Sequence, residues 1–329
     1  MIPRDRNAYQ RKAQPIQCLR TLPCQFQEVD YRTAQAGECI KALKQDGAVI
    51  LRNILDQSVL ERIKEDVRPA FERDVPYTRS NAFPKETRRA NGLIGKSVAF
   101  TEHIVGNQLY QSICDELLSC SHQMVWGDQK HTASAKPILD ATTCFSVGPG
   151  AKNQPLHRDD SLHHNHLSEI TAPEYTNGRD ELVGFFVAGT DTTKANGATR
   201  VIPGSHLWGM DTMPREADAV HVELRAGDGL IMLGSCFHGG SANTTNDEYR
   251  IVLAVFMTKG INRTEENQFL ANSLDDFKKY DKSIQNIAGF RMGALGWVDF
   301  RDPKHLLAKD PSLYPPGYNE DVEGSQRSE

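Results

Sequence analysis

Residues 139–259 consist of short apolar runs separated by glycine, proline, asparagine and aspartate, and this pattern limits the possible folds more than any other feature of the chain. Runs of this length, each bounded by turn-forming residues, predict β-strands, and a succession of them indicates a β-sandwich or barrel. Turn chemistry is present at 148–150, 196–197, 203–205 and 226–229. The expected strands cover 141–148, 181–190, 199–203, 219–224, 229–233 and 250–258.

The N-terminal part of the chain has a different pattern. Residues 33–46 and 57–73 predict amphipathic helices on either side of a buried strand at 48–51, and a further helix is expected at 107–120. The segment 74–104 has little periodicity and predicts a long loop that could act as a lid. A helix is expected after 264, and 310–329 is expected to be a flexible tail.

These patterns predict one domain over 1–329, mainly β with flanking helices. In this division, 1–138 is a buttress of helices and loops, 139–262 is the β core, and 263–309 is a helical extension before the tail at 310–329. The exposed face of a C-terminal helix could pair in a homodimer.

The net charge and the cysteine content limit which binding partners and which cellular compartment are expected. The net charge of -5 gives no reason to expect nucleic acid or an anionic membrane as a partner, and no apolar run is long enough to cross a bilayer. The start of the chain, residues 1–7, is polar and unlike a signal peptide. The seven cysteines are scattered and odd in number, which argues against a disulfide framework. We therefore expect a cytoplasmic protein with a small-molecule substrate.

A candidate metal site begins at His157 and Asp159, which follow a glycine turn after a predicted strand. Residues two apart in extended chain point the same way. Two imidazoles and one carboxylate on one face of an octahedron are the ligand set of Fe(II) oxygenases, which keep three positions open. His238 is the best third ligand because it follows the strand 229–233 and precedes two glycines that let the chain turn closely.

Arg250 opens the last predicted strand, 12 residues after His238. A charged side chain at the mouth of a buried strand needs a partner, because an unpaired buried charge is costly. A guanidinium binds carboxylates bidentately, so the distal carboxylate of 2-oxoglutarate is a natural partner. The set therefore predicts iron, 2-oxoglutarate and O2 chemistry.

In this order, the motifs resemble the phytanoyl-CoA dioxygenase family, particularly its fungal secondary-metabolism branch. The resemblance rests on the segments 154–160, 196–206, 238–241 with Arg250, and 263–268. It implies a double-stranded β-helix, a jelly-roll of the cupin type, that binds Fe(II) and 2-oxoglutarate.

By position, the resemblance makes His157, Asp159 and His238 the iron ligands. Arg250 would hold the 2-oxoglutarate carboxylate, with Gln154, Thr199 and Ser241 as further cosubstrate contacts. The implied reaction is hydroxylation, desaturation, epoxidation or oxidative cyclisation of a small natural-product intermediate.

Other interpretations remain open at this stage. The chain could be an acyl-CoA hydroxylase like phytanoyl-CoA dioxygenase itself, a β-helix isomerase or binding protein that does not use 2-oxoglutarate, or a zinc hydrolase. The substrate pocket is expected to include Phe145 and Leu162, with parts of 74–104 and 290–300. The histidines 163, 164 and 166 could touch substrate, and His206, in a turn, is expected to be structural.

Overall fold

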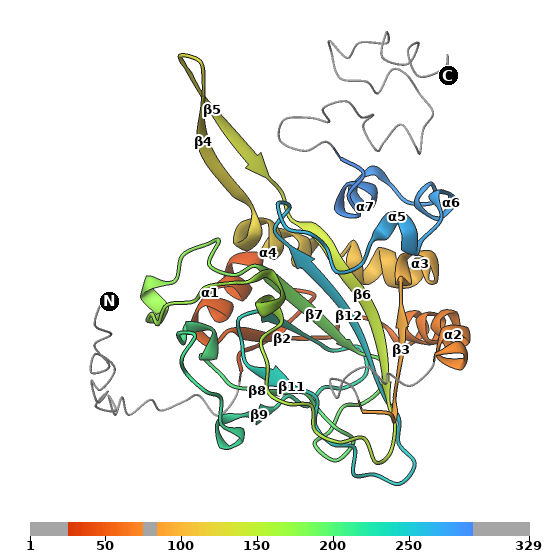
Figure 1. Cartoon of the computed structure of the whole chain (residues 1–329). Helices are drawn as coiled ribbons and strands as arrows, with labels where there is room; N and C mark the ends of the chain where they lie inside the picture. Colours follow the sequence, from red (N-terminus) through yellow and green to blue (C-terminus); the bar gives the residue numbers. More distant parts are fainter. Residues whose placement is uncertain (1–25, 75–83, 292–329) are drawn as a thin grey trace, which may run out of the picture.

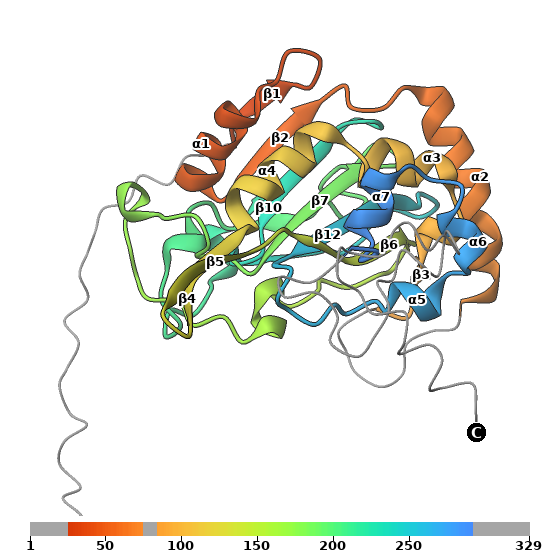
Figure 2. The ribbon, with the colours of Figure 1, turned by 90° about the horizontal axis from the view of Figure 1, so that it is seen from above.

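The computed structural model describes residues 26–74 and 84–291 of the chain. Its centre is a seven-stranded sheet in the order β1-β2-β10-β7-β12-β6-β3. Helices cover one face of this sheet, and a small sheet of three strands, β11-β8-β9, lies on the opposite side (Figures 1 and 2). This arrangement confirms the predicted double-stranded β-helix core with flanking helices.

The strands of the large sheet pair antiparallel except β1 with β2. A separate hairpin, β4–β5, projects from the body (Figure 1). The strands are β1 (Glu28–Asp30), β2 (Ala48–Arg52), β3 (Thr87–Asn91), β4 (Cys120–Trp126), β5 (Gln129–Ala135), β6 (Ile138–Val147), β7 (Leu182–Ala188), β8 (Arg200–Val201), β9 (Val220–His221), β10 (Gly229–Leu233), β11 (His238–Gly239) and β12 (Arg250–Thr258).

The helices begin before the β core and return after it. They are α1 (Ala36–Asp46), α2 (Gln57–Arg73), α3 (Val98–Phe100), α4 (Gln108–Leu118), α5 (Gln268–Ala271), α6 (Leu274–Phe277) and α7 (Lys282–Ile287). A 3-10 turn, η3 (Asp159–His163), follows β6 and is important for the site. None of the helices in the described ranges is both long and apolar enough to cross a membrane.

The alternation of side chains along β10 explains the two cores. Ile231 and Leu233 join the large cluster under the helices, whereas Leu230 and Met232 join a smaller cluster with Val201 and Val222 of the small-sheet side. Successive strand residues point to opposite faces, so a strand that is covered on both faces must be apolar at every position. This requirement explains why 229–233 contains no polar residue.

Two segments differ from the sequence prediction. The expected loop at 74–104 contains β3, a 3-10 turn (Leu93–Gly95), α3 and a π-helical turn (Thr101–Val105). β3 was missed because it is an edge strand with mainly polar residues. The β4–β5 hairpin was missed for a similar reason: almost all of its side chains are exposed, so no alternation marks it.

The C-terminal expectations are partly outside the described residues. In place of one helix after 264, the chain forms the three short helices α5, α6 and α7. The tail at 310–329 and most of the 290–300 segment lie beyond residue 291, and the structure does not describe them.

Candidate metal centre and its cavity

Backbone pairing holds His157 and His238 side by side. The N–H of each residue donates to the carbonyl of the other, at 2.9 Å in both directions, which makes an isolated antiparallel bridge. Gly239 permits this close approach, because a Cβ at that position would lie 2.9 Å from the Gln154 carbonyl oxygen. A glycine is therefore needed after His238, because a larger residue would collide with the neighbouring backbone.

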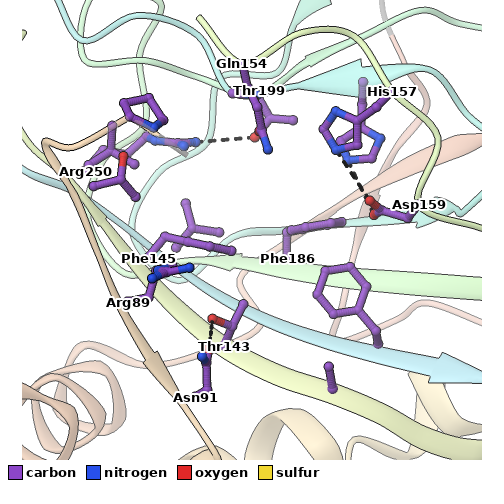
Figure 3. Close-up of a pocket in the computed structure, with 18 of the residues that line it drawn as sticks. Arg89, Asn91, Thr143, Phe145, Gln154, His157, Asp159, Phe186, Thr199 and Arg250 are labelled. Carbon is purple, nitrogen blue, oxygen red and sulfur yellow. Dashed lines mark hydrogen bonds and ion pairs between the residues drawn. The ribbon is translucent and has the colours of Figure 1, made fainter. Parts of the chain in front are cut away.

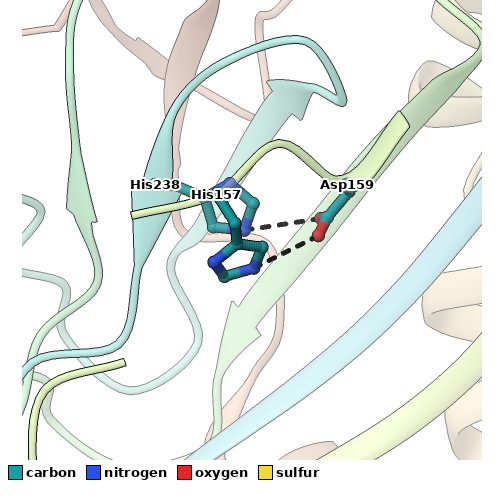
Figure 4. Close-up of side chains that lie close together, drawn as sticks. All are labelled: His157, Asp159 and His238. Atoms are coloured by element: carbon teal, nitrogen blue, oxygen red, sulfur yellow. Dashed lines mark ion pairs between the residues drawn. The ribbon is translucent and has the colours of Figure 1, made fainter. Parts of the chain in front are cut away.

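Asp159 completes a group of three candidate ligands with the two histidines (Figure 4). Its Oδ1 lies 3.5 Å from His157 Nε2, and its Oδ2 lies 3.4 Å from His238 Nε2. One ligand atom from each residue lies within 4.8 Å of the other two. Asp159 was expected in extended chain, but it is the first residue of η3. The turn still brings the carboxylate to the two imidazoles.

The tautomers of both histidines suit metal binding. His157 Nδ1 is 2.8 Å from the Pro155 carbonyl oxygen, and His238 Nδ1 is 3.2 Å from the Cys236 carbonyl oxygen. A carbonyl can only accept, so each Nδ1 carries the proton and each Nε2 keeps a lone pair. Metal-bound histidines show the same pattern of a second nitrogen donating to a carbonyl.

Burial and the contacts among the three residues set their charge states. Burial lowers the pKa of His238, which keeps this ring neutral. Burial alone would raise the pKa of Asp159, but the two histidines outweigh it and the pKa is lowered. For His157, burial is outweighed by the Asp159 carboxylate, and the pKa is raised. Two nitrogen donors around an ionised carboxylate match the ligand set that Fe(II) oxygenases use.

The three residues lie in the wall of a cavity of about 510 Å³ (Figure 3). This volume is within the usual range of small-molecule sites. The cavity brings together the other residues that the sequence analysis named as cosubstrate contacts. They are Gln154, Thr199, Ser241 and Arg250.

Arg250 is the cation of this group, and its side chain is deeply buried. Only 5% of the residue is exposed, and burial lowers its pKa to about 10, so it remains charged at pH 7. Its NH1 group donates to Thr199 Oγ1 at 3.3 Å, while Nε has no hydrogen-bond partner among the described residues. The buried Ser241 hydroxyl also has no partner there. A bound carboxylate would satisfy both, so these residues fit 2-oxoglutarate.

The individual residues of the opposite wall were not named from the sequence, although parts of 74–104 were expected there. β3 contributes Arg89 and Asn91, and Asn91 Oδ1 accepts a hydrogen bond from Thr143 Oγ1 at 2.6 Å. Phe186 and Phe256 pack edge to face in the same cavity, with centroids 5.3 Å apart. The two aromatic residues could have been found from the sequence, because both lie within predicted strands. β3 itself had no recognisable pattern.

Of the two predicted pocket residues, Phe145 lines the cavity. The expectation for Leu162 is wrong: its side chain is 59% exposed and is not among the lining residues. Leu162 lies in η3, where it and Ser161 are exposed while Asp160 is buried. Part of the 74–104 segment does line the cavity, through Pro84, Thr87, Arg89 and Asn91.

His206 is buried outside the cavity, in the structural position that its turn predicted. Its Nε2 lies 3.1 Å from the Lys44 carbonyl oxygen, and its ring packs against Tyr175 at a centroid distance of 5.9 Å. Burial lowers the pKa of His206 to about 4. The ring is therefore neutral in the folded protein at pH values where an unfolded histidine, with an ordinary pKa near 6.5, begins to protonate.

This difference predicts an acid-dependent loss of stability. Between about pH 6.5 and pH 4 the unfolded chain binds a proton at His206 that the folded chain does not, so His206 costs about 1.4 kcal/mol per pH unit as the pH falls. His206→Gln, which can still donate to Lys44, should flatten the curve of unfolding free energy against pH in this window. Urea unfolding of both proteins at pH 7, 6 and 5 measures the free energy of unfolding and hence its slope against pH. Equal slopes in both proteins would contradict the assignment.

Solved structures similar to this chain include two enzymes of nogalamycin biosynthesis. The epimerase SnoN, described as non-heme and alpha ketoglutarate dependent, has a TM-score of 0.50 and 17% identity over 68% of this chain and 83% of its own. The carbocyclase SnoK, with the same description, has a TM-score of 0.50 and 14% identity over 70% of this chain and 87% of its own. At these identities the likeness supports the fold alone.

Curated relatives are more similar in sequence. Dioxygenase himG of Aspergillus japonicus is 38% identical over 85% of this chain and 89% of its own length. Dioxygenase peniF of Penicillium patulum is 36% identical over 88% of this chain and 94% of its own length. Dioxygenase cnsJ of Penicillium expansum is 35% identical over 86% of this chain and 84% of its own length. The family model for phytanoyl-CoA dioxygenase (PhyH) matches residues 43–252, a span that includes all three candidate metal ligands and Arg250. The resemblance seen in the sequence is thereby confirmed, and the chain belongs to the phytanoyl-CoA dioxygenase family.

Proposed function

We propose that this chain is an Fe(II)- and 2-oxoglutarate-dependent dioxygenase that oxidises a small natural-product intermediate. His157, Asp159 and His238 hold the iron. Arg250 binds the distal carboxylate of 2-oxoglutarate, assisted by Gln154, Thr199 and Ser241. The observation that carries the proposal is the cavity itself, in which two imidazole lone pairs and a carboxylate converge and a buried arginine lies in the same wall.

When bound, Fe(II) and 2-oxoglutarate supply the redox chemistry of O2 activation, with the cosubstrate leaving as succinate and carbon dioxide. The protein residues supply charge and position. The Asp159 carboxylate offsets part of the metal charge, and the Pro155 and Cys236 carbonyls fix the two imidazoles with Nε2 directed at the site. Arg250 provides a fixed cation without reorganisation, because it is already buried and charged.

The shape of the cavity supports a small substrate. Phe145, Phe186 and Phe256 give it flat apolar walls, while Arg89 and Asn91 place polar groups along one side. A molecule with a rigid apolar body and a few polar substituents would suit such walls. SnoN and SnoK, which share the fold, are enzymes of nogalamycin biosynthesis. The same class of substrate is proposed for this chain.

Anaerobic titration tests the proposed cofactors. The purified protein should develop a weak visible charge-transfer band when Fe(II) and 2-oxoglutarate are both present, and not with either alone. Admission of O2 with a turned-over substrate should yield succinate in proportion to product. Zn(II) should support neither the band nor succinate. Activity restored by Zn(II) but not Fe(II) would instead indicate a hydrolase, and absence of the band would contradict the proposal.

A further inference from the structure

Three histidines follow the candidate metal loop, and the structure gives them different surroundings. His164 and His166 are exposed. The side chain of His163 is only 5% exposed, and it faces Asp140, whose side chain is 3% exposed. The three histidines therefore do not form one cluster, although they are close in sequence. Of the three, His163 alone has a buried side chain.

The partner of His163 is itself held firmly. Asp140 lies in β6, and its Oδ1 accepts the backbone N–H of Glu265 at 3.1 Å. Its backbone carbonyl accepts the N–H of Glu266 at 2.9 Å. His163 Nε2 lies 3.6 Å from Asp140 Oδ1 and has no hydrogen-bond partner among the described residues. Asp140 thus offers His163 a fixed point on the large sheet.

The turn that ends at His163 begins at Asp159. Among the described residues, the Asp159 carboxylate has only His157 and His238 as polar partners. No backbone N–H or neutral side chain orients it, so the backbone of η3 must fix its direction. One part of this turn is anchored through Asp160, whose N–H donates to the Gly234 carbonyl at 3.2 Å. At the far end of the turn, His163 contacts Asp140 of β6.

We propose that His163 is a positioning residue for the metal centre. Its buried contact with Asp140 fixes the end of η3 and thereby holds the Asp159 carboxylate in the direction in which it can bind metal together with His157 and His238. The inference rests on the proposed metal site. It goes beyond it by assigning a role to a residue that binds neither metal nor cosubstrate.

The charge states agree with such a contact. Burial lowers the pKa of His163 and raises the pKa of Asp140 to about 7. A neutral ring beside a carboxyl that is partly protonated at neutral pH avoids the cost of two unpaired charges in a buried place. Groups that hold metal ligands in place by hydrogen bonds typically affect metal affinity by about 10- to 100-fold, and this range sets the scale for an anchor of the turn that carries Asp159.

Metal affinity, measured without turnover, tests the proposal. Binding of Mn(II) to the full chain can be followed by the EPR signal of the free ion. His163→Ala should weaken Mn(II) binding roughly 10-fold or more, and Asp140→Ala should do the same. The double variant should be no weaker than either single variant, because both remove one contact. His166→Ala, in the same loop but exposed, is the matched control and should bind Mn(II) like the wild type.

Two further variants separate positioning from loss of packing, and they serve if the alanine variant fails to fold. His163→Gln can place an amide nitrogen near the position of the imidazole Nε2, whereas His163→Asn is too short to reach it. The Mn(II) affinity of His163→Gln should stay within a few-fold of wild type, whereas His163→Asn should lose affinity as His163→Ala does. Equal affinity in all His163 variants, or an equal loss in His166→Ala, would overturn the inference. A wild-type chain without any Mn(II) site would overturn the proposed function as well, so the two failures can be told apart.

Discussion

His157→Ala is expected to abolish turnover, with a loss of at least about 4 kcal/mol in transition-state stabilisation, or roughly 10³-fold in rate. The variant removes one of three candidate ligands, and the remaining imidazole and carboxylate cannot form a three-sided site. His157 is the ligand of choice for this test because its side chain is 36% exposed, so its removal leaves no sealed void. Mn(II) binding and succinate formation measure the effect.

The matched control for this variant is His221→Ala. His221 lies in β9, in the same small sheet as His238, but it is not among the residues that line the cavity. Its removal should leave metal affinity and turnover unchanged. If His157→Ala retains wild-type turnover, or if His221→Ala loses it to the same extent, the ligand assignment is wrong.

The elements that could be predicted accurately from sequence are those covered by protein on at least one side. β10 and β12 have the bounds expected from their apolar runs, and α2 has the bounds expected from its amphipathic period. In each case burial imposes a repeating pattern of side chains, and that pattern is what a sequence displays. The division of the whole chain into buttress, core and extension remains a prediction.

Elements at the edge of the protein could not be predicted in this way. β3 pairs with β6 on one side only, and its sequence is mainly polar. Its position depends on pairing with residues far along the chain, which no local pattern records. As a result Arg89 and Asn91, which face the cavity from β3, could not be named individually, although the 74–104 segment was expected to contribute to the pocket and Phe145 on the neighbouring strand was named.

The candidate metal site was visible in the sequence because its residues follow strands in a fixed order. The local geometry of the site could not be seen in the sequence. His157 and Asp159 were expected to point the same way because they lie two apart in extended chain, but Asp159 starts a 3-10 turn. That turn needs anchors, and the contact of His163 with Asp140 joins segments that only the folded structure brings together. The same turn leaves Leu162 exposed.

Arg250→Met is expected to weaken 2-oxoglutarate binding by about 2–4 kcal/mol, or roughly 30- to 800-fold. The buried guanidinium is the cosubstrate's only proposed ionic partner besides the metal, and Met keeps most of its volume without the charge. Metal affinity should change little, because the proposed ligands do not include Arg250. Isothermal titration with 2-oxoglutarate in the presence of Mn(II) measures the loss, and Arg250→Lys should recover only part of it since an ammonium lacks the bidentate fork.

The stability of wild type and that of Arg250→Met should respond differently to 2-oxoglutarate, which gives a second test of the same role. Without ligand, wild type keeps a deeply buried cation whose Nε has no partner within residues 26–74 and 84–291, so Arg250→Met should be at least as stable as wild type. With Mn(II) and enough 2-oxoglutarate to saturate wild type, the melting temperature of wild type should rise and that of the variant should rise much less, because a ligand stabilises a protein in proportion to how well it binds. Arg89→Met, at the other guanidinium of the cavity, is the matched control and should retain the ligand-dependent rise. A rise that is lost in Arg89→Met and kept in Arg250→Met would place the cosubstrate carboxylate at the β3 wall instead.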